Sequence, residues 1–467
     1  MPHNKKTPHL LTLHQIAQWS GADCCLPALV RRQTITGVNN DSRTIGTTEV
    51  FVALSTEKDD GHRYVADALR RGATAALVAK KKLHLAADAD PKKLMVVSDP
   101  LKALQRIASN YRGMLDIPLI GITGSSGKTT ARSFIAAVLK QKLTVGETSG
   151  NLNNHIGVPI SLLRFNGTED IGLIEMGANH EKEIHLLSKI AKPTIGIVTN
   201  VGYAHIGYFG SLAAIARAKL EIVDGMSGKS DFLLLNGDDP VLISAARGIR
   251  NNAVYFGFSR RCNVRARNAR VADGTGTLFE VDGEEYRLAI PGRYFIYSAL
   301  LAIHLGVHFG VQRRRIAGAL ESLRPVALRG TIEKKSGITF IVDCYNANPS
   351  SMKAAIGLLR DVAGKNRPMA IVGDMLELGR FSPRLHGQLG RQLADAGVHG
   401  ILAVGAFASI VADGAIAAGM KASNVRTARD SAEALALVNQ ILRPGDVVLL
   451  KGSRGVHLET VFEGFKS

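Results

Sequence analysis

The sequence predicts an α/β protein of three domains, each built around a sheet of mostly parallel strands. Its 467 residues exceed what a single hydrophobic core usually organises. Short apolar segments alternate with helical patterns along most of the chain, which favours parallel sheets. The 48 glycines suit tight turns and phosphate-binding loops. We place the domains at residues 1–100, 101–324 and 325–467.

The first domain is expected to alternate short strands with helices. Residues 49–54 and 73–79 read as strands, and residues 62–71 between them read as a helix that Gly72 ends. Asp99-Pro100 then breaks the chain, and residues 101–114 have the spacing of an amphipathic helix.

The second domain begins with an apolar strand at residues 117–122. Residues 263–289 change to an alternating pattern around Asp273-Gly274 and Asp282-Gly283, which are hairpin signals. We therefore expect a small β-meander within this domain.

In the third domain, strand and helix patterns alternate again, which predicts a Rossmann-like, doubly wound parallel sheet. The strand candidates are residues 339–343, 369–373, 400–404 and 446–450, and the helix candidates are residues 383–396 and 431–442.

The charge and composition of the chain limit the kinds of binding partner that we expect. The net charge of +18 attracts polyanions in general. The basic runs at residues 80–82, 260–270 and 313–315 carry no alternating aromatic residues, so they lack the stacking platform of a single-strand binder. We interpret them as a solvated basic face and expect no nucleic-acid partner.

No apolar window is long enough to span a membrane, and the first residues lack a signal-peptide pattern. We therefore expect a cytoplasmic protein without membrane insertion. The four cysteines show no metal-binding spacing and are expected to be reduced thiols.

The motif GITGSSGKTT at residues 121–130 carries the clearest chemistry. It follows an apolar strand and opens a helical pattern over residues 131–140, which is the context of a phosphate-binding loop. Lys128 is placed to reach the β- and γ-phosphates, and the Thr129 hydroxyl to bind Mg²⁺. The spacing departs from the usual motif, because Ile122 stands where its first glycine is expected and Gly121 comes one position early. The predicted ligands of ATP are Gly124, Ser125, Ser126, Gly127, Lys128, Thr129 and Thr130.

The form of this loop resembles that of the Mur ligase family, and further segments along nearly the whole chain resemble it too. They are NDSRT (40–44), DGH (60–62), GNLNNHIGVP (150–159), IEMGANH (174–180), AKLEI (218–222), DCYNANP (343–349), GDMLELG (373–379) and KGSR (451–454).

The resemblance implies an ATP-dependent amide ligase of peptidoglycan precursor synthesis. Within the family, GNLNN, YNANP and GDMLELG are similar to the member that adds D-alanyl-D-alanine to a UDP-N-acetylmuramoyl-tripeptide. The γ-phosphate would pass to the carboxylate of the tripeptide, and the amine would attack the resulting acyl phosphate. These two substrates, ATP and Mg²⁺ are the expected partners, and we expect a monomer with mobile domains.

The resemblance also assigns metal-binding and catalytic roles in the second domain. It implies that Glu175, His205 and Thr129 bind metal, and that Lys128, Glu175 and His205 are catalytic. Lys219 would join the metal site as a carbamate, which turns its amine into an anion. Two plainer interpretations remain open: a surface role for His205, and a helix lysine at position 219 paired with Glu221 or solvent.

Substrate contacts are implied in all three domains. Ser42, Arg43, Asn151 and Asn154 would hold the UDP-linked substrate. Arg329 and Asp343 would complete the ATP site from the third domain. The residues expected on the D-alanyl-D-alanine side are Tyr345, Asn346, Asn348, Lys451 and Arg454.

The chain departs from the family at GRYFIYSAL (292–300), where the family has His-Asn after Gly-Arg and a further asparagine before Ala-Leu. These family asparagines contact adenine, so we expect Tyr294 or Phe295 to stack on the purine instead.

Two other functions are compatible with a phosphate loop. One is a different carboxylate–amine ligase of this fold, such as a folylpolyglutamate synthase or another Mur step. The other is a P-loop ATPase that binds nucleic acid, which the charge of +18 would favour.

Overall fold

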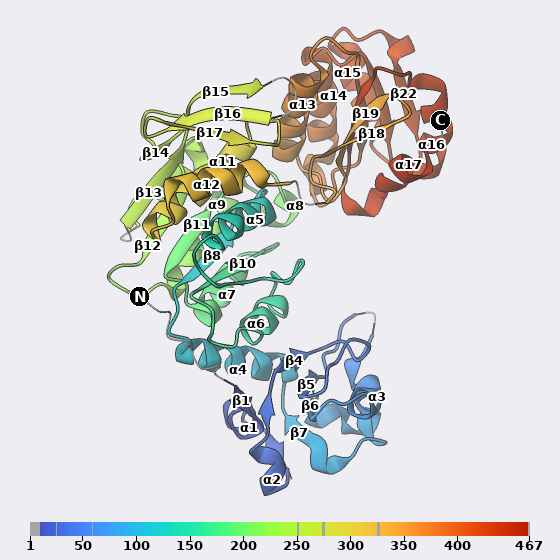
Figure 1. Ribbon diagram of the computed structural model, residues 1–467. Coiled ribbons are helices and arrows are strands. Elements are labelled where there is room, and N and C mark those ends of the chain that lie inside the picture. The colour runs from blue at the N-terminus through green and yellow to red at the C-terminus, as the bar shows by residue number, and fades with distance from the viewer. Residues whose placement is uncertain are drawn as a thin grey trace.

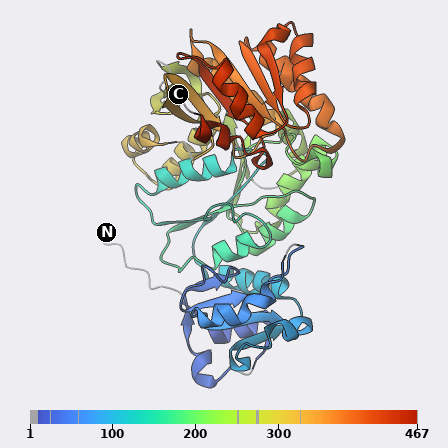
Figure 2. The same ribbon diagram turned by 90° about the vertical axis from the view of Figure 1, so that its right-hand side faces the viewer.

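Parallel strands covered by helices form three large sheets in the computed structural model, one in each of three lobes (Figure 1). The structure describes residues 10–24, 26–57, 59–249, 252–272, 276–324 and 327–465. In both views the middle lobe lies between the N-terminal and C-terminal lobes (Figures 1 and 2). The predicted α/β class with parallel sheets is confirmed.

The N-terminal lobe has a five-stranded sheet in the order β2-β7-β6-β5-β4, parallel except for β2. Its strands are β2 (Asp23–Cys24), β4 (Gly37–Asn39), β5 (Glu49–Val52), β6 (Ala75–Ala79) and β7 (Leu94–Val97), beside the antiparallel pair β1 (Leu11–Thr12) and β3 (Thr34–Ile35). Its helices are α1 (Leu13–Ser20), α2 (Ala28–Arg31), η1 (Gly61–Tyr64), α3 (Val65–Arg70), η2 (Lys80–Ala86) and η3 (Pro91–Lys93).

Helix α4 (Pro100–Met114) joins this lobe to the next, because it packs against α1 on one side and against α6 and α7 on the other. The Asp99 side chain accepts hydrogen bonds from the N–H groups of Leu101 and Lys102, and Pro100 occupies the first helical position. The Asp-Pro pair that breaks the preceding strand therefore also starts the helix.

The middle lobe has a seven-stranded parallel sheet in the order β14-β13-β12-β11-β8-β10-β9. Its strands are β8 (Leu119–Thr123), β9 (Val145–Glu147), β10 (Ile171–Glu175), β11 (Ile195–Val198), β12 (Phe232–Asn236), β13 (Asn252–Gly257) and β14 (Val264–Arg265). Its helices are α5 (Lys128–Leu139), α6 (Gly157–Leu162), α7 (Glu183–Ala191), α8 (Ile206–Phe209), α9 (Leu212–Leu220), η4 (Glu221–Gly225), α10 (Pro240–Ala245), α11 (Phe295–His308) and α12 (Arg313–Ser322).

Helices cover both faces of this sheet. Successive residues of β8 point to opposite faces: Ile120 and Ile122 pack in one apolar cluster with residues of α5 and α11, whereas Leu119 packs in another with residues of α4 and α7. The sheet is thus buried on both sides, as its nearly continuous apolar strands require.

The predicted β-meander is present as β15 (Arg267–Ala272), β16 (Gly276–Val281) and β17 (Glu284–Leu288), which pair antiparallel. Asp282 and Gly283 both have positive φ, as a tight hairpin turn requires. Asp273-Gly274, the other predicted turn, lies outside the described residues.

The C-terminal lobe has a six-stranded sheet in the order β18-β19-β23-β20-β21-β22. Its strands are β18 (Thr331–Lys335), β19 (Ile338–Asp343), β20 (Pro368–Gly373), β21 (Gly400–Val404), β22 (Val425–Ala428) and β23 (Val447–Lys451). Its helices are α13 (Pro349–Ala363), η5 (Gly379–Phe381), α14 (Ser382–Asp395), α15 (Ala408–Ala417), η6 (Ala422–Asn424), α16 (Ser431–Ile441), η7 (Arg454–Val456) and α17 (Glu459–Gly464). The four predicted strands and both predicted helices are found. The sheet also carries β18 as an antiparallel edge strand, which the alternation did not predict.

Within the described part of the chain, no helix combines the length and apolar character needed to cross a membrane.

A buried arginine fastens α4 to the middle lobe. The Arg112 side chain is 7% exposed and donates to the carbonyl oxygens of Leu115 (2.7 Å), Ile117 (3.1 Å) and Ala191 (2.9 Å). Burial lowers its pKa. The guanidinium is therefore held by carbonyl dipoles at the ends of α4 and α7.

We expect Arg112→Met to lower the free energy of unfolding by about 3 kcal/mol, because buried carbonyls left without a donor cost about 1–3 kcal/mol each. Urea unfolding followed by circular dichroism measures the loss. Arg70→Met, which removes an exposed guanidinium, should change stability by less than about 0.5 kcal/mol. Equal transitions for the two variants would contradict the structural role of Arg112.

Candidate nucleotide and metal site

The carboxyl ends of three neighbouring strands meet at one edge of the middle sheet. The register places Glu175 of β10 beside Ile122 of β8, and Val198 of β11 beside Thr123 of β8. The loop after β8, the last residue of β10 and the loop after β11 therefore lie together. Ligands of open parallel sheets bind at such an edge.

The loop after β8 requires its glycines. Gly124 has φ +142°, and a Cβ atom there would lie 2.0 Å from Oγ1 of Thr199. Gly127 has φ +79° and precedes α5, and among the described residues no side chain caps that helix. The first N–H groups of α5 have no carbonyl partner within the helix, so they are available to an anion.

The loop after β11 forms hydrogen bonds with the loop after β8 and supports it. Asn200 accepts hydrogen bonds from the N–H groups of Ser125 (3.0 Å, to its carbonyl) and Ser126 (3.1 Å, to its side chain). The Ser125 hydroxyl donates to the Gly202 carbonyl at 3.1 Å and accepts from its N–H at 2.9 Å. These contacts fix the loop from outside its own sequence.

The unusual spacing of the motif has a structural explanation. Gly121 and Ile122 both lie within β8 and are buried. A Cβ atom on Gly121 would lie 3.1 Å from Met176 and 3.2 Å from Ile222, so this glycine serves packing beside the sheet. The loop itself begins at Gly124.

Lys128, the first residue of α5, lies over this loop. Its Nζ donates to the Gly124 carbonyl at 2.7 Å. Burial is the largest cause of a lowered pKa, and the charge of Arg329 lowers it further, whereas Glu175 acts in the opposite direction. Arg329 belongs to the C-terminal lobe, so that lobe contributes positive charge to the same site.

Thr129 and Glu175, two of the predicted metal ligands, are brought together. The Thr129 hydroxyl donates to Oε2 of Glu175 at 3.2 Å. Glu175 is 1% exposed. Its Oε1 accepts no hydrogen bond from the described residues, although the Arg132 guanidinium lies 3.3 Å from it as an ion pair. A buried carboxylate beside a hydroxyl offers the oxygen ligands that a hard cation such as Mg²⁺ prefers.

His205 faces the C-terminal lobe instead. Its Nδ1 lies 2.6 Å from Oε2 of Glu377, and this contact is the largest cause of the lowered pKa of that carboxyl. The sequence did not single out Glu377, which lies within the quoted GDMLELG segment. No cluster of three or more histidine, cysteine, aspartate or glutamate side chains that could hold a metal occurs in the part of the chain that the structure describes.

The backbone strengthens this contact between lobes. The Gly207 N–H donates to the Glu377 carbonyl at 3.1 Å. A Cβ atom on Gly207 would lie 2.8 Å from the backbone nitrogen of Gly379. Glycine at position 207 therefore lets α8 and the segment before η5 touch through their backbones.

Lys219 lies inside the middle lobe, on α9. It is 2% exposed, and its Nζ donates to the Ala178 carbonyl at 3.2 Å. Burial, and then the nearby charge of Lys128, lowers its pKa to about 7. A helix lysine paired with Glu221 or solvent does not describe this placement, because Lys219 is buried. The Glu221 carboxylate instead accepts hydrogen bonds from the backbone N–H groups of Lys182 and His185, at the start of α7.

In the C-terminal lobe, two of the predicted substrate residues are paired with each other. Nζ of Lys451, which is 1% exposed, lies 2.7 Å from Oδ2 of Asp343, and it donates to the Asn346 carbonyl at 2.9 Å. The neighbouring Arg329 guanidinium lies 3.9 Å from the centre of the Tyr345 ring. Lys451 thus holds this turn together from within.

Asn348 and Arg454 also have protein partners. The Asn348 side chain accepts from the Ser351 N–H at 3.0 Å and caps α13. Arg454 lies 3.0 Å from the Glu459 carboxylate and is 56% exposed.

The predicted UDP-substrate residues lie on two lobes. Ser42 is buried, and the exposed Arg43 guanidinium is held by both carboxylate oxygens of Asp41, at 2.9 and 2.7 Å. Asn151 and Asn154 lie in the loop between β9 and α6, where the Asn154 side chain accepts from the Gly157 N–H at 2.9 Å.

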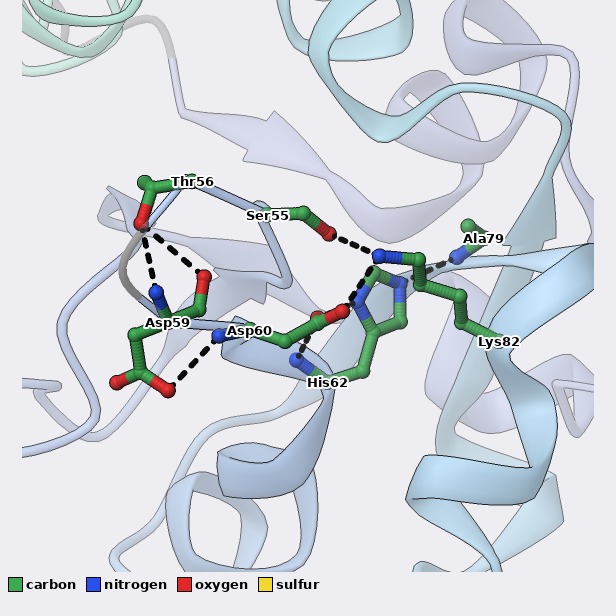
Figure 3. A network of polar contacts seen from close by, with 7 residues as sticks. All are labelled: Ser55, Thr56, Asp59, Asp60, His62, Ala79 and Lys82. Atoms are coloured by element: carbon green, nitrogen blue, oxygen red, sulfur yellow. Dashed lines mark hydrogen bonds and ion pairs between the residues drawn. The ribbon is translucent and has the colours of Figure 1, made fainter.

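The DGH segment forms a polar network around the buried His62 in the N-terminal lobe (Figure 3). The Ala79 N–H donates to Nε2 of His62 at 2.9 Å, so Nδ1 carries the proton that faces Asp60 at 2.6 Å. The Lys82 ammonium also contacts Asp60 and donates to the Ser55 hydroxyl at 2.7 Å. Burial acts to raise the pKa of Asp60, but hydrogen bonds from Lys82 and His62 outweigh it and hold the pKa well below its usual range.

Of the two residues expected to stack on the purine, the structure excludes one, Phe295. Phe295 is 1% exposed and stacks on Phe134 of α5, with ring centres 6.1 Å apart. It belongs to the core and cannot stack on a purine. Tyr294 is only partly buried, and its ring lies 4.0 Å from that of Phe295.

Three family models match the chain in succession. They are the catalytic domain of the Mur ligase family over residues 34–112, the Mur ligase middle domain over residues 122–306, and the Mur ligase glutamate ligase domain over residues 329–454.

Similar proteins cover nearly the full chain. UDP-N-acetylmuramoyl-tripeptide–D-alanyl-D-alanine ligase of Bacillus subtilis is 33% identical over 91% of this chain and 92% of its own length. The protein of the same name in Mycobacterium tuberculosis is 33% identical over 97% and 96%.

Solved structures of similar fold also cover nearly the full chain. A crystal structure of MurF from Acinetobacter baumannii has a TM-score of 0.86 at 28% identity and covers 98% of this chain and 99% of its own. MurF from Thermotoga maritima in complex with ADP has a TM-score of 0.80 at 27% identity, covering 92% and 96%.

We expect Gly207→Ala to separate the C-terminal lobe from α8, because the added Cβ meets backbone atoms that cannot rotate away. Small-angle X-ray scattering should show a larger radius of gyration than for the unsubstituted protein. Gly357→Ala is the matched control, since a Cβ there meets no atom within 4 Å. An unchanged radius for Gly207→Ala would show that the contact does not hold the lobes together.

Proposed function

The chain belongs to the Mur ligase family, and we propose that it joins D-alanyl-D-alanine to a UDP-N-acetylmuramoyl-tripeptide at the expense of ATP. The observation that carries the proposal is the similarity, over nearly the whole of both chains, to ligases that bear this name. The reaction would supply a peptidoglycan precursor.

The chemistry follows from the weakness of a carboxylate as an electrophile. A carboxylate oxygen of the tripeptide attacks the γ-phosphorus of ATP, the bond to the β-γ bridging oxygen breaks, and ADP leaves. The amine of D-alanyl-D-alanine then attacks the acyl carbon, loses a proton, and inorganic phosphate departs as the amide forms. Such transfers depend on positioning and charge neutralisation.

Three positive groups supply that neutralisation. Lys128 and the N-terminus of α5 face the loop of Gly124 and Gly127, and support for their role comes from the free N–H groups and the inward ammonium. Arg329 adds charge from the C-terminal lobe, near enough to lower the pKa of Lys128. In the same lobe, Asp343 pairs with Lys451. We propose Ser125, Ser126, Thr130, Arg329 and Asp343 as the remaining residues of the ATP site.

Thr129 and Glu175 would hold Mg²⁺, which would offset phosphate charge when bound. His205 and Lys219 complete the proposed set. A lysine contributes there only as a carbamate, and the buried amine with a pKa of about 7 suits that modification, since the neutral form is the one that adds CO₂.

We propose that each of the three lobes binds a different part of the substrates. Residues 1–100 would hold the UDP group through Ser42 and Arg43, with Asn151 and Asn154 across from it. Residues 101–324 would hold ATP, and residues 325–467 would close over it and hold D-alanyl-D-alanine. Arg43 is exposed and free to turn from Asp41 to a diphosphate, which it suits by its planar pair of donors.

On the D-alanyl-D-alanine side, Tyr345 and the exposed Asn346 are the proposed direct contacts. Asn348 and Lys451 would act by holding the turn that carries them, as their buried bonds suggest. Arg454 would need to leave Glu459 to meet an acidic group. We propose a monomer located in the cytoplasm.

The test mixes ATP, Mg²⁺, UDP-N-acetylmuramoyl-tripeptide and D-alanyl-D-alanine with the protein. Phosphate and a UDP-linked pentapeptide should appear in equal amounts, the first by a colorimetric assay and the second by mass spectrometry. Phosphate release that does not depend on D-alanyl-D-alanine would contradict the proposal.

We expect Lys128→Ala to reduce the rate of ligation by at least about 100-fold, because a phosphoryl-transfer site loses the charge that faces the β- and γ-phosphates. The same assay measures the loss. Lys140→Ala, at the far end of α5, is the control and should keep its rate. Similar rates for the two variants would contradict the assignment of the nucleotide site to this loop.

We expect a carbamate on Lys219 that grows with pH. Below a pKa of about 7 the ammonium dominates and cannot add CO₂, whereas above it the neutral amine does. With ¹³C-labelled bicarbonate, a carbamate resonance should be stronger at pH 8 than at pH 6 and should vanish in Lys219→Met but not in Lys189→Met. A resonance that persists in Lys219→Met would assign it to another amine.

A further inference from the structure

Arg132 lies one helical turn after Lys128 on α5 and is 12% exposed. Its role in the site is not explained by the nucleotide loop alone. Residues four apart on a helix share a face, so the guanidinium enters the same region as the Lys128 ammonium. It faces Glu175 and the turn after β9, and these two contacts define what it does.

The first contact is with the proposed metal carboxylate. Nη1 of Arg132 lies 3.3 Å from Oε1 of Glu175, while Oε2 accepts from Thr129 at 3.2 Å. The Glu175 backbone N–H donates to the Thr148 hydroxyl at 3.0 Å. Glu175 thus accepts a hydrogen bond on one side-chain oxygen, faces an ion-pair partner on the other, and is bonded to Thr148 through its backbone.

The second contact is with the turn that follows β9. Nη1 of Arg132 donates to the Thr148 carbonyl and, at 3.4 Å, to the Gly150 carbonyl. Nε lies 3.6 Å from the Glu147 carboxylate. Gly150 has φ +56° and leads directly into Asn151, so the guanidinium fixes the start of the loop that reaches Asn154.

One side chain therefore connects three parts of the site: the phosphate helix, the carboxylate at the end of β10, and the loop before α6. A guanidinium suits this task because it carries donors in a rigid plane. A lysine in its place would offer a single point charge.

We propose that Arg132 is a positioning residue, which sets the loop of residues 148–154 and the Glu175 carboxylate in one register relative to the phosphate helix. The proposal rests on the proposed function, since the loop is thereby aligned with the UDP-linked substrate. The acid to be activated then arrives at a fixed distance from the phosphoryl group.

An electrostatic role and a positioning role of Arg132 predict different effects of its removal, so experiment can distinguish them. A cation at Arg132 repels a metal ion at Glu175, so its removal strengthens metal binding if charge alone matters. Loss of position instead lowers turnover and the affinity for the UDP-linked substrate. Changes in residues that orient metal ligands typically reduce activity by about 10- to 100-fold.

The experiment compares Arg132→Met and Arg132→Lys with Arg367→Met as a matched control. Arg367 is also a mostly buried arginine paired with a carboxylate, at 2.6 Å from Asp446, but it lies in the C-terminal lobe. For Arg132→Met, kcat should fall about 10- to 100-fold and the KM for the UDP-linked substrate should rise. The affinity for ADP with Mn²⁺, measured by calorimetry, should not weaken. Arg132→Lys should recover only part of the loss.

Two further readouts separate positioning from general stability. Methylguanidine added to Arg132→Met should restore part of the rate, but should not affect Arg367→Met. Hydrogen exchange in a peptide spanning residues 147–154 should rise in Arg132→Met only. The exchange measurement needs no ligation, so it still tests Arg132 if the unsubstituted protein proves inactive on these substrates, which would overturn the proposed function instead.

The inference is overturned if Arg132→Met keeps its kcat and its KM for the UDP-linked substrate. It is also overturned if the loss follows weaker nucleotide binding, or if exchange over residues 147–154 is unchanged.

Discussion

The close approach of Gly124 to Thr199 sets the geometry on which the rest of the site depends. Because β8 and β11 are neighbouring parallel strands, their following loops leave the sheet side by side. A side chain at position 124 would occupy the space of the Thr199 hydroxyl. The missing Cβ lets the second loop support the first through Asn200 and Gly202. Among the described residues, no side chain caps the N-terminus of α5 that follows.

The site concentrates positive charge around Lys128, close to the buried carboxylate of Glu175. Lys128, Arg132 and Lys219 belong to the middle lobe, and Arg329 approaches from the C-terminal lobe. Two of them, Lys128 and Lys219, have lowered pKa values, chiefly through burial. Such an arrangement is unfavourable without an anion, and a triphosphate is the kind of ligand that offsets it. The large net charge of the chain is therefore less informative than the placement of these four cations.

The lobes are connected at the same end of the sheet where the chemistry is proposed. Ser125 of the phosphate loop forms hydrogen bonds with Gly202. His205 and Gly207, which follow Gly202 in the chain, contact Glu377 of the C-terminal lobe. The phosphate loop and the C-terminal lobe thus share one short segment of chain.

The sequence by itself determined what depends on local geometry. The phosphate loop, its helix, the break at Asp99-Pro100 and the meander turn at Asp282-Gly283 follow from residue types within a few positions, and the strand and helix alternation predicted the fold class. Tertiary structure decided what depends on partners far along the chain. Lys451 pairs with Asp343, and Glu377 meets His205 across two lobes. Phe295 is taken into the core by Phe134, and Arg132 meets a strand end and a turn that lie on other elements. No periodicity encodes these contacts, because each is set by the packing of whole sheets and lobes, and burial then fixes the charge state of the groups involved.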